Sequence, residues 1–218
     1  CMLLWAHNPE KSWPGLYMND IRDGLKKGSK LIVVDPRRTN LAGKADNWLQ
    51  IRPGTDVALA LGFIHVIIEN ELYDKDFVQN WTDGFSALRE HVSYYTPEKT
   101  SEITWIPSDQ IEDAARMFAR HAPASIGPGM GGTSQGNDAF DLNRALTIIS
   151  AITGNLEVAG GNLRLPAPTS KRSCYGPDHD PFFNLPKDQA LKKLGLKQFP
   201  LQQFIPIPSP PQTVWPAI

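Results

Sequence analysis

Short apolar runs alternate with helical patterns along the first part of the chain. Met2–Trp5 is a candidate strand. The continuous apolar residues Leu31–Val34 predict a strand that is buried on both faces, since such a strand needs no polar alternation. Between them, residues 17–27 carry Ile21 and Leu25 four positions apart and end at a glycine, as helices often do. This order of elements predicts an α/β fold with a mainly parallel sheet flanked by helices.

The following residues continue the same pattern. A long apolar helix follows Thr55 and Asp56, either of which is suited to cap it. A further strand then breaks into the glycine-rich run at residues 127–132 and leads into a helix, so the chain holds two α/β units in a Rossmann-like arrangement. The elements expected after residue 50 are helices over residues 57–69, 75–81, 85–95 and from 107 onward, a strand over 124–126 and a helix over 138–153.

The composition changes after Gly161. Eleven of the nineteen prolines fall within residues 162–218, and a helical pattern returns only around residues 188–194. Such a density of proline predicts irregular, extended chain, although the Phe and Trp residues there are too many for a purely solvated tail. We therefore expect an α/β region over residues 1–165 and a proline-rich tail over 166–218 that wraps over the domain or over further parts of the polypeptide.

Charge and length exclude several classes of partner. The 218 residues carry a formal net charge of -1, which gives no electric field to attract nucleic acid or an anionic membrane surface. The longest apolar run is too short to span a bilayer, so no direct membrane insertion is expected. The two cysteines lie far apart and lack the spacing of metal ligands. Because the chain opens on Cys1 inside an expected strand, we expect a piece of a longer polypeptide, and its compartment stays unknown.

Three loops follow strands or precede helices at the edge where open sheets bind ligands, the carboxyl ends of the strands. The first loop is Ala6-His7-Asn8-Pro9. Its Asn8 amide can bond to a phosphate or a ribose, and the alternative is a plain Asn-Pro turn.

The second loop runs from Asp35 through Arg37 and Arg38 to Thr39. A carboxylate just past a strand can accept hydrogen bonds from ribose hydroxyls, and guanidinium groups suit phosphate oxygens. Alternatively, Asp35 only caps the turn and the arginines are solvated. The motif therefore indicates a ligand site only together with the other motifs.

The third loop is Pro53-Gly54-Thr55-Asp56, in front of the apolar helix. Guanine presents two parallel donors, N1–H and its 2-amino group, and one carboxylate can accept both, which makes Asp56 a candidate for recognising guanine. The alternative is a turn followed by a helix cap.

Glycines are concentrated in the second α/β unit. The run that contains Gly129 and Gly131 allows close approach of the backbone and directs amides toward an anion. By itself the run is a weak signal, because it does not match the usual dinucleotide fingerprint. The glycines of Thr153-Gly154-Asn155 and of Gly160-Gly161 are candidates for helix-end and turn positions.

Taken in order, these stretches resemble the dimethyl sulfoxide reductase family of bis-molybdopterin guanine dinucleotide enzymes. The family pattern runs Gly-x-Asn-Pro, Asp-Pro-Arg-x-Thr, Ala-Asp, Pro-Gly-Thr-Asp-x-Ala-Leu, a glycine-rich loop, Thr-Gly-Asn and Gly-Gly. The chain differs in having Ala6 for the common glycine and His7 for a small residue. The corresponding stretches are residues 6–9, 35–39, 45–46, 53–59, 129–136, 153–155 and 160–161.

The resemblance implies a role for particular residues. Asn8, Asp35, Arg37 and Asp56 would hold the guanosine and pyrophosphate of one dinucleotide, and Gly129 and Gly131 would serve the loop near the other. No residue of the chain is assigned as catalytic or as a metal ligand. The cofactor-binding positions predicted in this way are Asn8, Asp35, Arg37, Thr39, Pro53, Gly54, Asp56, Gly129 and Gly131.

The resemblance also implies parts that the chain does not contain. The full-length enzyme would carry molybdopterin guanine dinucleotide with molybdenum or tungsten, and a 4Fe-4S cluster in an amino-terminal part. Its partners would be the other portions of the same polypeptide, a small-molecule substrate and an electron-transfer iron-sulfur subunit. The enzyme would transfer two electrons or an oxygen atom on that substrate, while the fragment itself would be inactive.

Two other hypotheses stay open. One is a scaffold domain of a related respiratory iron-sulfur subunit that has lost the cofactor, against which Asp35 and Asp56 argue. The other is an unrelated nucleotide-dependent dehydrogenase, which the lack of a Gly-x-Gly-x-x-Gly run near the first strand disfavours. The substrate is undetermined among thiosulfate, polysulfide, arsenical, nitrate and non-redox hydratase substrates, and a formate dehydrogenase is less favoured because the residues after Gly161 depart from its pattern.

Overall fold

A parallel four-stranded sheet forms the centre of the α/β region. The computed structural model describes residues 1–12, 14–136, 138–163 and 188. In these residues the strands are β1 (Met2–Trp5), β2 (Leu31–Val34), β3 (Asn47–Leu49) and β4 (Ser125–Pro128), in the spatial order β3-β2-β1-β4. All three strand pairings are parallel. The α/β fold with a mainly parallel sheet is therefore confirmed.

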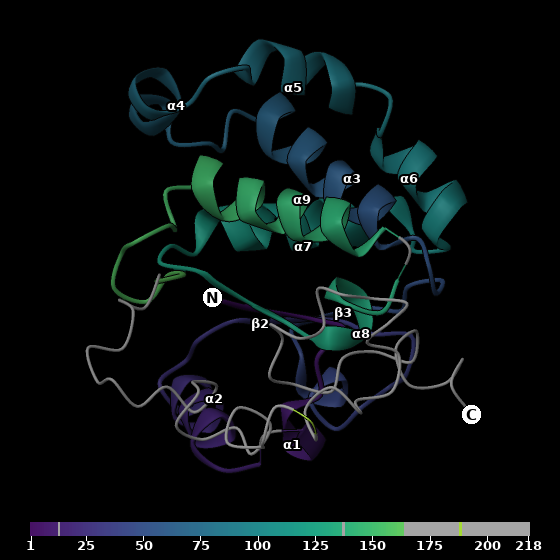
Figure 1. Cartoon of the computed structure of the whole chain (residues 1–218), viewed down its shortest axis with the longest axis vertical. Helices are drawn as coiled ribbons and strands as arrows, with labels where there is room; N and C mark the ends of the chain where they lie inside the picture. Colours follow the sequence, from purple (N-terminus) through teal and green to yellow (C-terminus); the bar gives the residue numbers. More distant parts are fainter. Residues whose placement is uncertain (13, 137, 164–187, 189–218) are drawn as a thin grey trace. The chain divides into compact units, whose positions relative to one another are not determined.

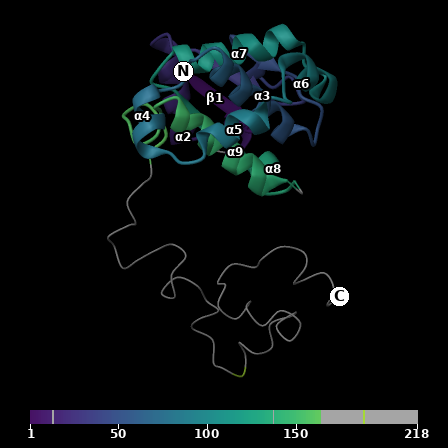
Figure 2. The same ribbon diagram turned by 90° about the horizontal axis from the view of Figure 1, so that it is seen from above.

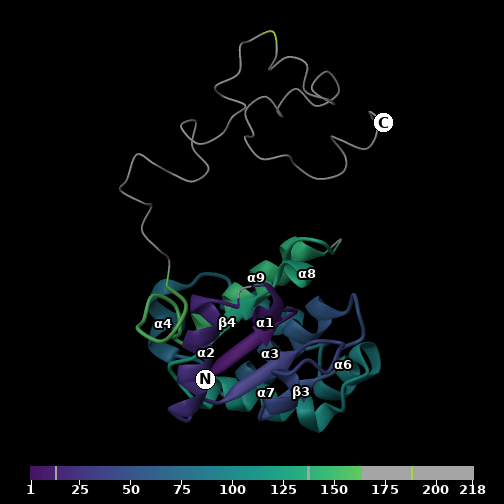
Figure 3. The ribbon, with the colours of Figure 1, turned by 90° about the horizontal axis from the view of Figure 1, so that it is seen from below.

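Helices cover both faces of this sheet. Figure 1 shows α3, α7 and α9 on one face, with α4, α5 and α6 outside them, and α1 and α2 on the other face. The same layers are seen from below in Figure 3. The helices are α1 (Pro9–Ser12), α2 (Leu16–Lys26), α3 (Asp56–Glu69), α4 (Lys75–Trp81), α5 (Phe85–Val92), α6 (Pro97–Thr104), α7 (Ser108–Arg120), α8 (Met130–Thr133) and α9 (Ala139–Ile152), with a 3-10 turn η1 at Ala42–Lys44.

The two faces of the strands bury two separate apolar clusters. Leu3 and Trp5 of β1 pack into the larger cluster, together with α3, α7 and α9. Leu4 of β1 and Val33 of β2 point the other way and pack against α2. All four residues of β2 are buried, because successive side chains of a strand alternate between two covered faces. This accounts for the uninterrupted apolar run in the sequence.

Helix α3 is buried on nearly all sides. Nine of its fourteen residues are buried, because α7 and α9 flank it and α5 and α6 pack on it as well. A helix that is enclosed on nearly all sides is apolar around most of its surface. Gly62 permits the close approach of α6, since a Cβ at that position would lie 2.6 Å from the Thr100 hydroxyl oxygen.

The strand order creates a switch point between β1 and β4. From β1 the chain adds β2 and then β3 on one side, and it later returns to add β4 on the other side. The loops that follow β1 and β4 therefore leave the sheet side by side and in different directions. In open α/β sheets this crevice, at the carboxyl ends of the strands, is the usual place for a ligand.

Several local features differ from the sequence-based expectations. Strand β3 and helix α6 were not expected, although Thr96 and Pro97 form a clear helix start in which the Thr96 hydroxyl accepts a hydrogen bond from the backbone of Lys99 at 3.2 Å. The prediction that Thr55 or Asp56 caps α3 with its side chain is wrong. The Thr55 hydroxyl instead donates to the Arg52 carbonyl at 2.7 Å.

The carboxyl-terminal part is a separate unit. The chain divides into compact units at Cys1–Arg164 and Leu165–Ile218. The predicted tail over residues 166–218 and its helix around 188–194 lie outside the described residues, apart from the helical and exposed residue 188. Figure 2 shows the α/β region from above. Within the described residues, no helix has the length and apolar character needed to cross a membrane.

Candidate functional site

The loop after β1 places unpaired polar atoms beside the switch point. Oδ1 of Asn8 and Nδ1 of His7 are buried from solvent, and neither has a hydrogen-bond partner among the described residues. A buried polar atom without a partner costs about 1 to 3 kcal/mol. Such atoms call for an explanation, and a bound ligand that supplies the missing partners is one.

The His7 ring is held in place by an aromatic neighbour. It stacks on Tyr17 of α2 with ring centroids 5.3 Å apart and an angle of 20° between the planes. Burial lowers the pKa of His7, while the backbone of Gly127 acts in the opposite direction. Gly127 lets the Tyr17 ring approach β4, because a Cβ at that position would overlap the Tyr17 hydroxyl. The loop after β1 and strand β4 are thus joined through α2.

Asp35 lies directly after β2, on the strand next to β1. Its carboxylate is only 8% exposed and accepts a hydrogen bond from the backbone N–H of Arg37 at 2.7 Å. The Arg37 guanidinium lies 4.0 Å from the same oxygen and is largely exposed. Asp35 therefore does shape its own turn, while the charged group of Arg37 is free to reach a ligand at the edge of the sheet.

The remainder of the second loop is occupied by local contacts. The Arg38 guanidinium lies over the Trp48 ring, 5.9 Å from its centre, and the Trp48 indole N–H donates to the Asp35 carbonyl at 2.9 Å. The Thr39 hydroxyl oxygen accepts a hydrogen bond from the backbone of Ala42 at 3.1 Å. Both arginines are exposed, and Arg38 in addition contacts an aromatic ring.

Asp56 is the first residue of α3, and it contacts the end of β1. The indole N–H of Trp5 donates to Asp56 Oδ1 at 2.8 Å. Burial raises the pKa of the Asp56 carboxyl, the Trp5 hydrogen bond lowers it, and the charge of Asp138 raises it. This carboxylate is therefore partly desolvated and hydrogen-bonded to the last residue of β1.

The turn in front of Asp56 is exposed. Pro53 and Gly54 are both exposed, and Gly54 has a φ of 82°, in the left-handed region that favours glycine. The conformation of this turn thus depends on the glycine of the motif.

The glycine-rich loop after β4 packs on the loop after β1. Gly129 donates its N–H to the Trp5 carbonyl at 2.8 Å, and a Cβ there would overlap the Ala6 carbonyl oxygen. Gly132 lies beside Asp56, since a Cβ there would be 3.7 Å from Asp56 Oδ1. At Gly131, which is exposed, a Cβ would meet no atom closer than 3.9 Å. Packing within the chain therefore requires a glycine at position 129 and leaves space at 131.

The last two motifs of the pattern lie at the free edge of the sheet. The Asn155 side chain accepts the Ala124 N–H at 2.7 Å. The Asn162 amide accepts the Ile126 N–H at 2.8 Å and donates to the Ile126 carbonyl at 2.9 Å, as a neighbouring strand would. These asparagines complete the hydrogen bonding of β4, a structural role.

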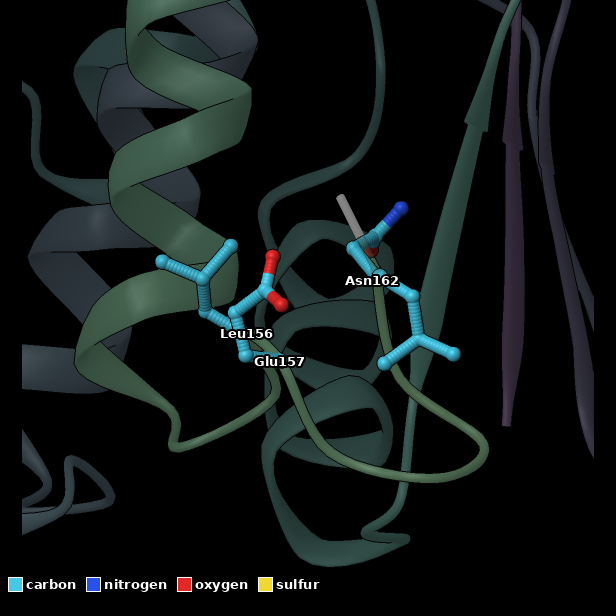
Figure 4. A pocket seen from close by; sticks show the side chains of 4 residues that line it. Leu156, Glu157 and Asn162 are labelled. Carbon is cyan, nitrogen blue, oxygen red and sulfur yellow. The ribbon is translucent and has the colours of Figure 1, made fainter. Parts of the chain in front are cut away.

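A hollow of about 620 Å³ lies next to this edge and is lined by Leu156, Glu157, Asn162 and Leu163 (Figure 4). A second hollow of about 120 Å³ lies between β4 and α9, and Asn162 lines it too. No predicted site residue is among the described residues that line either hollow.

The structure thus brings the predicted residues to one edge of the sheet. Asn8 follows β1, Asp35 follows β2, and Asp56 is tied to the last residue of β1. The sequence-based argument missed Trp5, because an apolar run gives no indication that its last ring carries a donor to a distant carboxylate. It also missed Tyr17 and Trp48, which position these loops by contacts between residues far apart in sequence.

Comparison with known proteins adds a family and several relatives. The family model described as molybdopterin oxidoreductase matches residues 1–189. The chain is 40% identical over 209 residues to acetylene hydratase of Syntrophotalea acetylenica, which covers 94% of this chain and 27% of the relative. It is 39% identical over 155 residues to formate dehydrogenase H of Escherichia coli, which covers 71% of this chain and 21% of the relative.

Two further matches agree with these. The thiosulfate reductase molybdopterin-containing subunit PhsA of Salmonella typhimurium is 35% identical over 161 residues, which is 73% of this chain and 21% of the relative. The solved structure of acetylene hydratase from Pelobacter acetylenicus superposes with a TM-score of 0.72 at 39% identity and covers 92% of this chain and 27% of that one. The chain thus spans about a fifth to a quarter of the length of these relatives.

Proposed function

The chain belongs to the molybdopterin oxidoreductase family, and from this premise we propose that it is part of the catalytic subunit of a molybdenum or tungsten enzyme. In this proposal, the carboxyl edge of the sheet holds the guanosine and pyrophosphate of a bis-molybdopterin guanine dinucleotide cofactor. The full-length enzyme transfers two electrons or an oxygen atom on a small substrate. The family of the chain supports the pterin, and the geometry of the edge supports the guanine dinucleotide form.

The unpaired oxygen of Asn8 carries the proposal. Asn8 Oδ1 is buried at the switch point without a hydrogen-bond partner in the described part of the chain. A hydroxyl or amine of a bound nucleotide would supply the missing donor. The adjoining loops match this need, because the Gly131 backbone has open space beside it. The residues present therefore fit a nucleotide-ended cofactor, and a scaffold without a cofactor would leave these features unexplained.

Each residue has a distinct part in this binding. Asp56 accepts the N1–H and 2-amino donors of guanine. Asp35 and Asn8 bond to ribose, and Arg37 attracts the pyrophosphate of the same dinucleotide, because cations favour phosphate oxygens. The backbone amides of the glycine-rich loop face the other dinucleotide. Thr39, Pro53 and Gly54 hold the backbone of these loops in the required conformation.

The chain's contribution is to bind and orient. When bound, the metal of the cofactor supplies the transfer of electrons or an oxygen atom. The metal ligand, the 4Fe-4S cluster and the remaining wall of the pocket are assigned to other portions of the polypeptide, and the electrons to a separate iron-sulfur subunit. The described residues fix one end of the cofactor, which places its reacting end.

A second candidate activity is hydration of acetylene without net redox change. The observation that favours it is the extent of the similarity to acetylene hydratase, which covers 94% of the chain and so includes most of the tail, against 71% for formate dehydrogenase H. A full-length protein of this kind would consume acetylene with no turnover of an electron donor or acceptor. Substrate-dependent reduction of an electron acceptor would instead favour the oxidoreductase.

The assignment of Asp56 is tested in the full-length enzyme. We expect Asp56→Ala to lower pterin content and activity together, at least about tenfold, because guanine loses a charged acceptor whose hydrogen bonds contribute about 1.5 to 3 kcal/mol. Pterin and guanine content are measured by chromatography after release from the protein, and the exposed Asp109→Ala is the control. Normal pterin content in the Asp56 variant would contradict the proposal.

A further inference from the structure

The Trp5–Asp56 hydrogen bond connects two elements of the candidate site. Trp5 ends β1 and is fully buried, and its ring packs edge-on against Phe63 of α3 with centroids 5.9 Å apart and 68° between planes. Its N–H reaches Asp56 Oδ1 at 2.8 Å, across 51 positions of sequence. The indole is therefore a rigid support for the carboxylate.

Asp56 has few other means of being oriented. At the start of a helix an aspartate usually accepts backbone N–H groups, but α3 has no side-chain cap. No lysine or arginine in the described part of the chain forms an ion pair with Asp56. A hydrogen bond to its own backbone lowers the pKa of Asp56, and the charge of Asp138 raises it. Trp5 is thus the side chain that fixes the position of this carboxylate.

The fixed carboxylate keeps room for a ligand. Oδ1 takes one donor from the indole. A carboxylate has about four lone-pair sites, so both of its oxygens can accept further donors. Gly132 faces this carboxylate, and even a Cβ at that position would lie 3.7 Å from Asp56 Oδ1. Two parallel donors can therefore meet the two oxygens only in the plane that the indole selects.

We propose that Trp5 is a positioning residue that sets the orientation in which Asp56 accepts the donor edge of guanine, and thereby the preference for guanine over bases with one donor. This rests on the proposed function of Asp56. Without the indole N–H, the carboxylate can rotate and becomes easier to protonate. The preference of the site for guanine should then weaken more than the packing around residue 5.

The test uses cofactor-free full-length protein with guanosine diphosphate as the probe. Inosine diphosphate, which has N1–H but lacks the 2-amino group, is the comparison. Binding of both is measured by calorimetry across pH for the parent, Trp5→Phe and the exposed control Trp81→Phe. A protein with 3-benzothienylalanine at position 5 keeps the shape of the indole and lacks only its N–H. It tests the role of this N–H if Trp5→Phe does not fold.

We expect the parent and Trp81→Phe to prefer guanosine diphosphate. In the position-5 variants that preference should fall about tenfold, the value of one charge-assisted hydrogen bond. Their binding should also be lost at a higher pH on the acidic side, because the Asp56 pKa loses the hydrogen bond that lowers it. An unchanged base preference and pH profile would overturn the role of Trp5 alone. No binding of guanosine diphosphate by the parent would instead overturn the proposed function.

Discussion

At the scale of single residues, the loop after β1 departs from its family at two positions, and the structure gives each a physical meaning. Ala6 has a φ of 50°, in the left-handed region, where the family pattern has glycine. His7 stands where a small residue is usual and stacks on Tyr17. The first departure costs backbone strain, and the second places a titratable ring beside the candidate site.

Replacing Ala6 by glycine should stabilise the protein. An L-residue in the left-handed region costs about 1 to 2 kcal/mol, and glycine removes this cost. Glycine also raises the conformational entropy of the unfolded chain, which offsets part of the gain, so we expect a net stabilisation of about 0.5 to 1 kcal/mol. The free energy of unfolding from denaturant titration measures it. Ala115→Gly in the middle of α7 is the control and should lose about 1 kcal/mol or more. A loss in both variants would refute the strain at residue 6.

Stability should depend on pH through His7. Burial lowers its pKa in the folded protein, so the unfolded chain binds a proton more readily and stability falls as pH drops through about 6.5, the ordinary pKa of histidine. His7→Gln should therefore lose less stability than the parent between pH 7.5 and pH 5. Unfolding titrations at both pH values measure the difference, with His91→Gln as the control for loss of an exposed imidazole. Equal pH dependence in the parent and His7→Gln would show that burial of this ring carries no such cost.

At the scale of elements, the free edge of β4 is completed by side chains instead of a strand. Asn162 bonds to the backbone of Ile126 in β4, and Asn155 bonds to the backbone of Ala124, the residue just before the strand. An open edge with unpaired backbone groups invites pairing with other chains. The Thr-Gly-Asn and Gly-Gly motifs therefore preserve the sheet, and Gly161 fits closely against Asn155, whose carbonyl a Cβ would overlap.

Asn155→Ala should destabilise the fold by about 1 to 3 kcal/mol. The buried N–H of Ala124 would lose its acceptor, and an unsatisfied buried donor costs about that much. Chemical denaturation measures the change, and Asn80→Ala on the exposed side of α4 should stay within about 0.5 kcal/mol of the parent. Equal stabilities for the two variants would mean that Asn155 is dispensable for the β4 edge.

Local patterns predicted most of these elements but not their partners. Periodicity predicts strands β1 and β2 and helices α3, α4, α7 and α9. A strand in the middle of the sheet must bury both faces, and a helix that packs on the sheet must bury one apolar stripe. Strand β3 has only three residues and mixed polarity, and it exists because β2 offers it an edge. The aspartate at position 56 looked like a helix cap, and only the tertiary contact with Trp5 shows otherwise.

At the scale of the whole molecule, the sheet order decides where the motifs meet. Loops at residues 6–9 and 129–136 are far apart in sequence, yet they leave adjacent strands at the switch point. The resemblance implied that the first loop holds one dinucleotide of the cofactor and that the second serves the loop near the other dinucleotide. Periodicity alone could not have given the order β3-β2-β1-β4. The chain covers about a quarter of the length of its relative acetylene hydratase, and the proposed function assigns the rest of the cofactor pocket to other portions of the polypeptide.

The most direct test of the central claim is hydrogen–deuterium exchange of the full-length protein with and without its cofactor. We predict slower exchange in the cofactor-bound protein at residues 5–9, 35–39, 53–57 and 127–133, because the guanine dinucleotide contacts these loops. The edge of β4 near Asn155 serves as the internal reference and should change little. Unchanged exchange in all four loops, with protection confined to other parts of the protein, would contradict the claim that this edge of the sheet holds the cofactor.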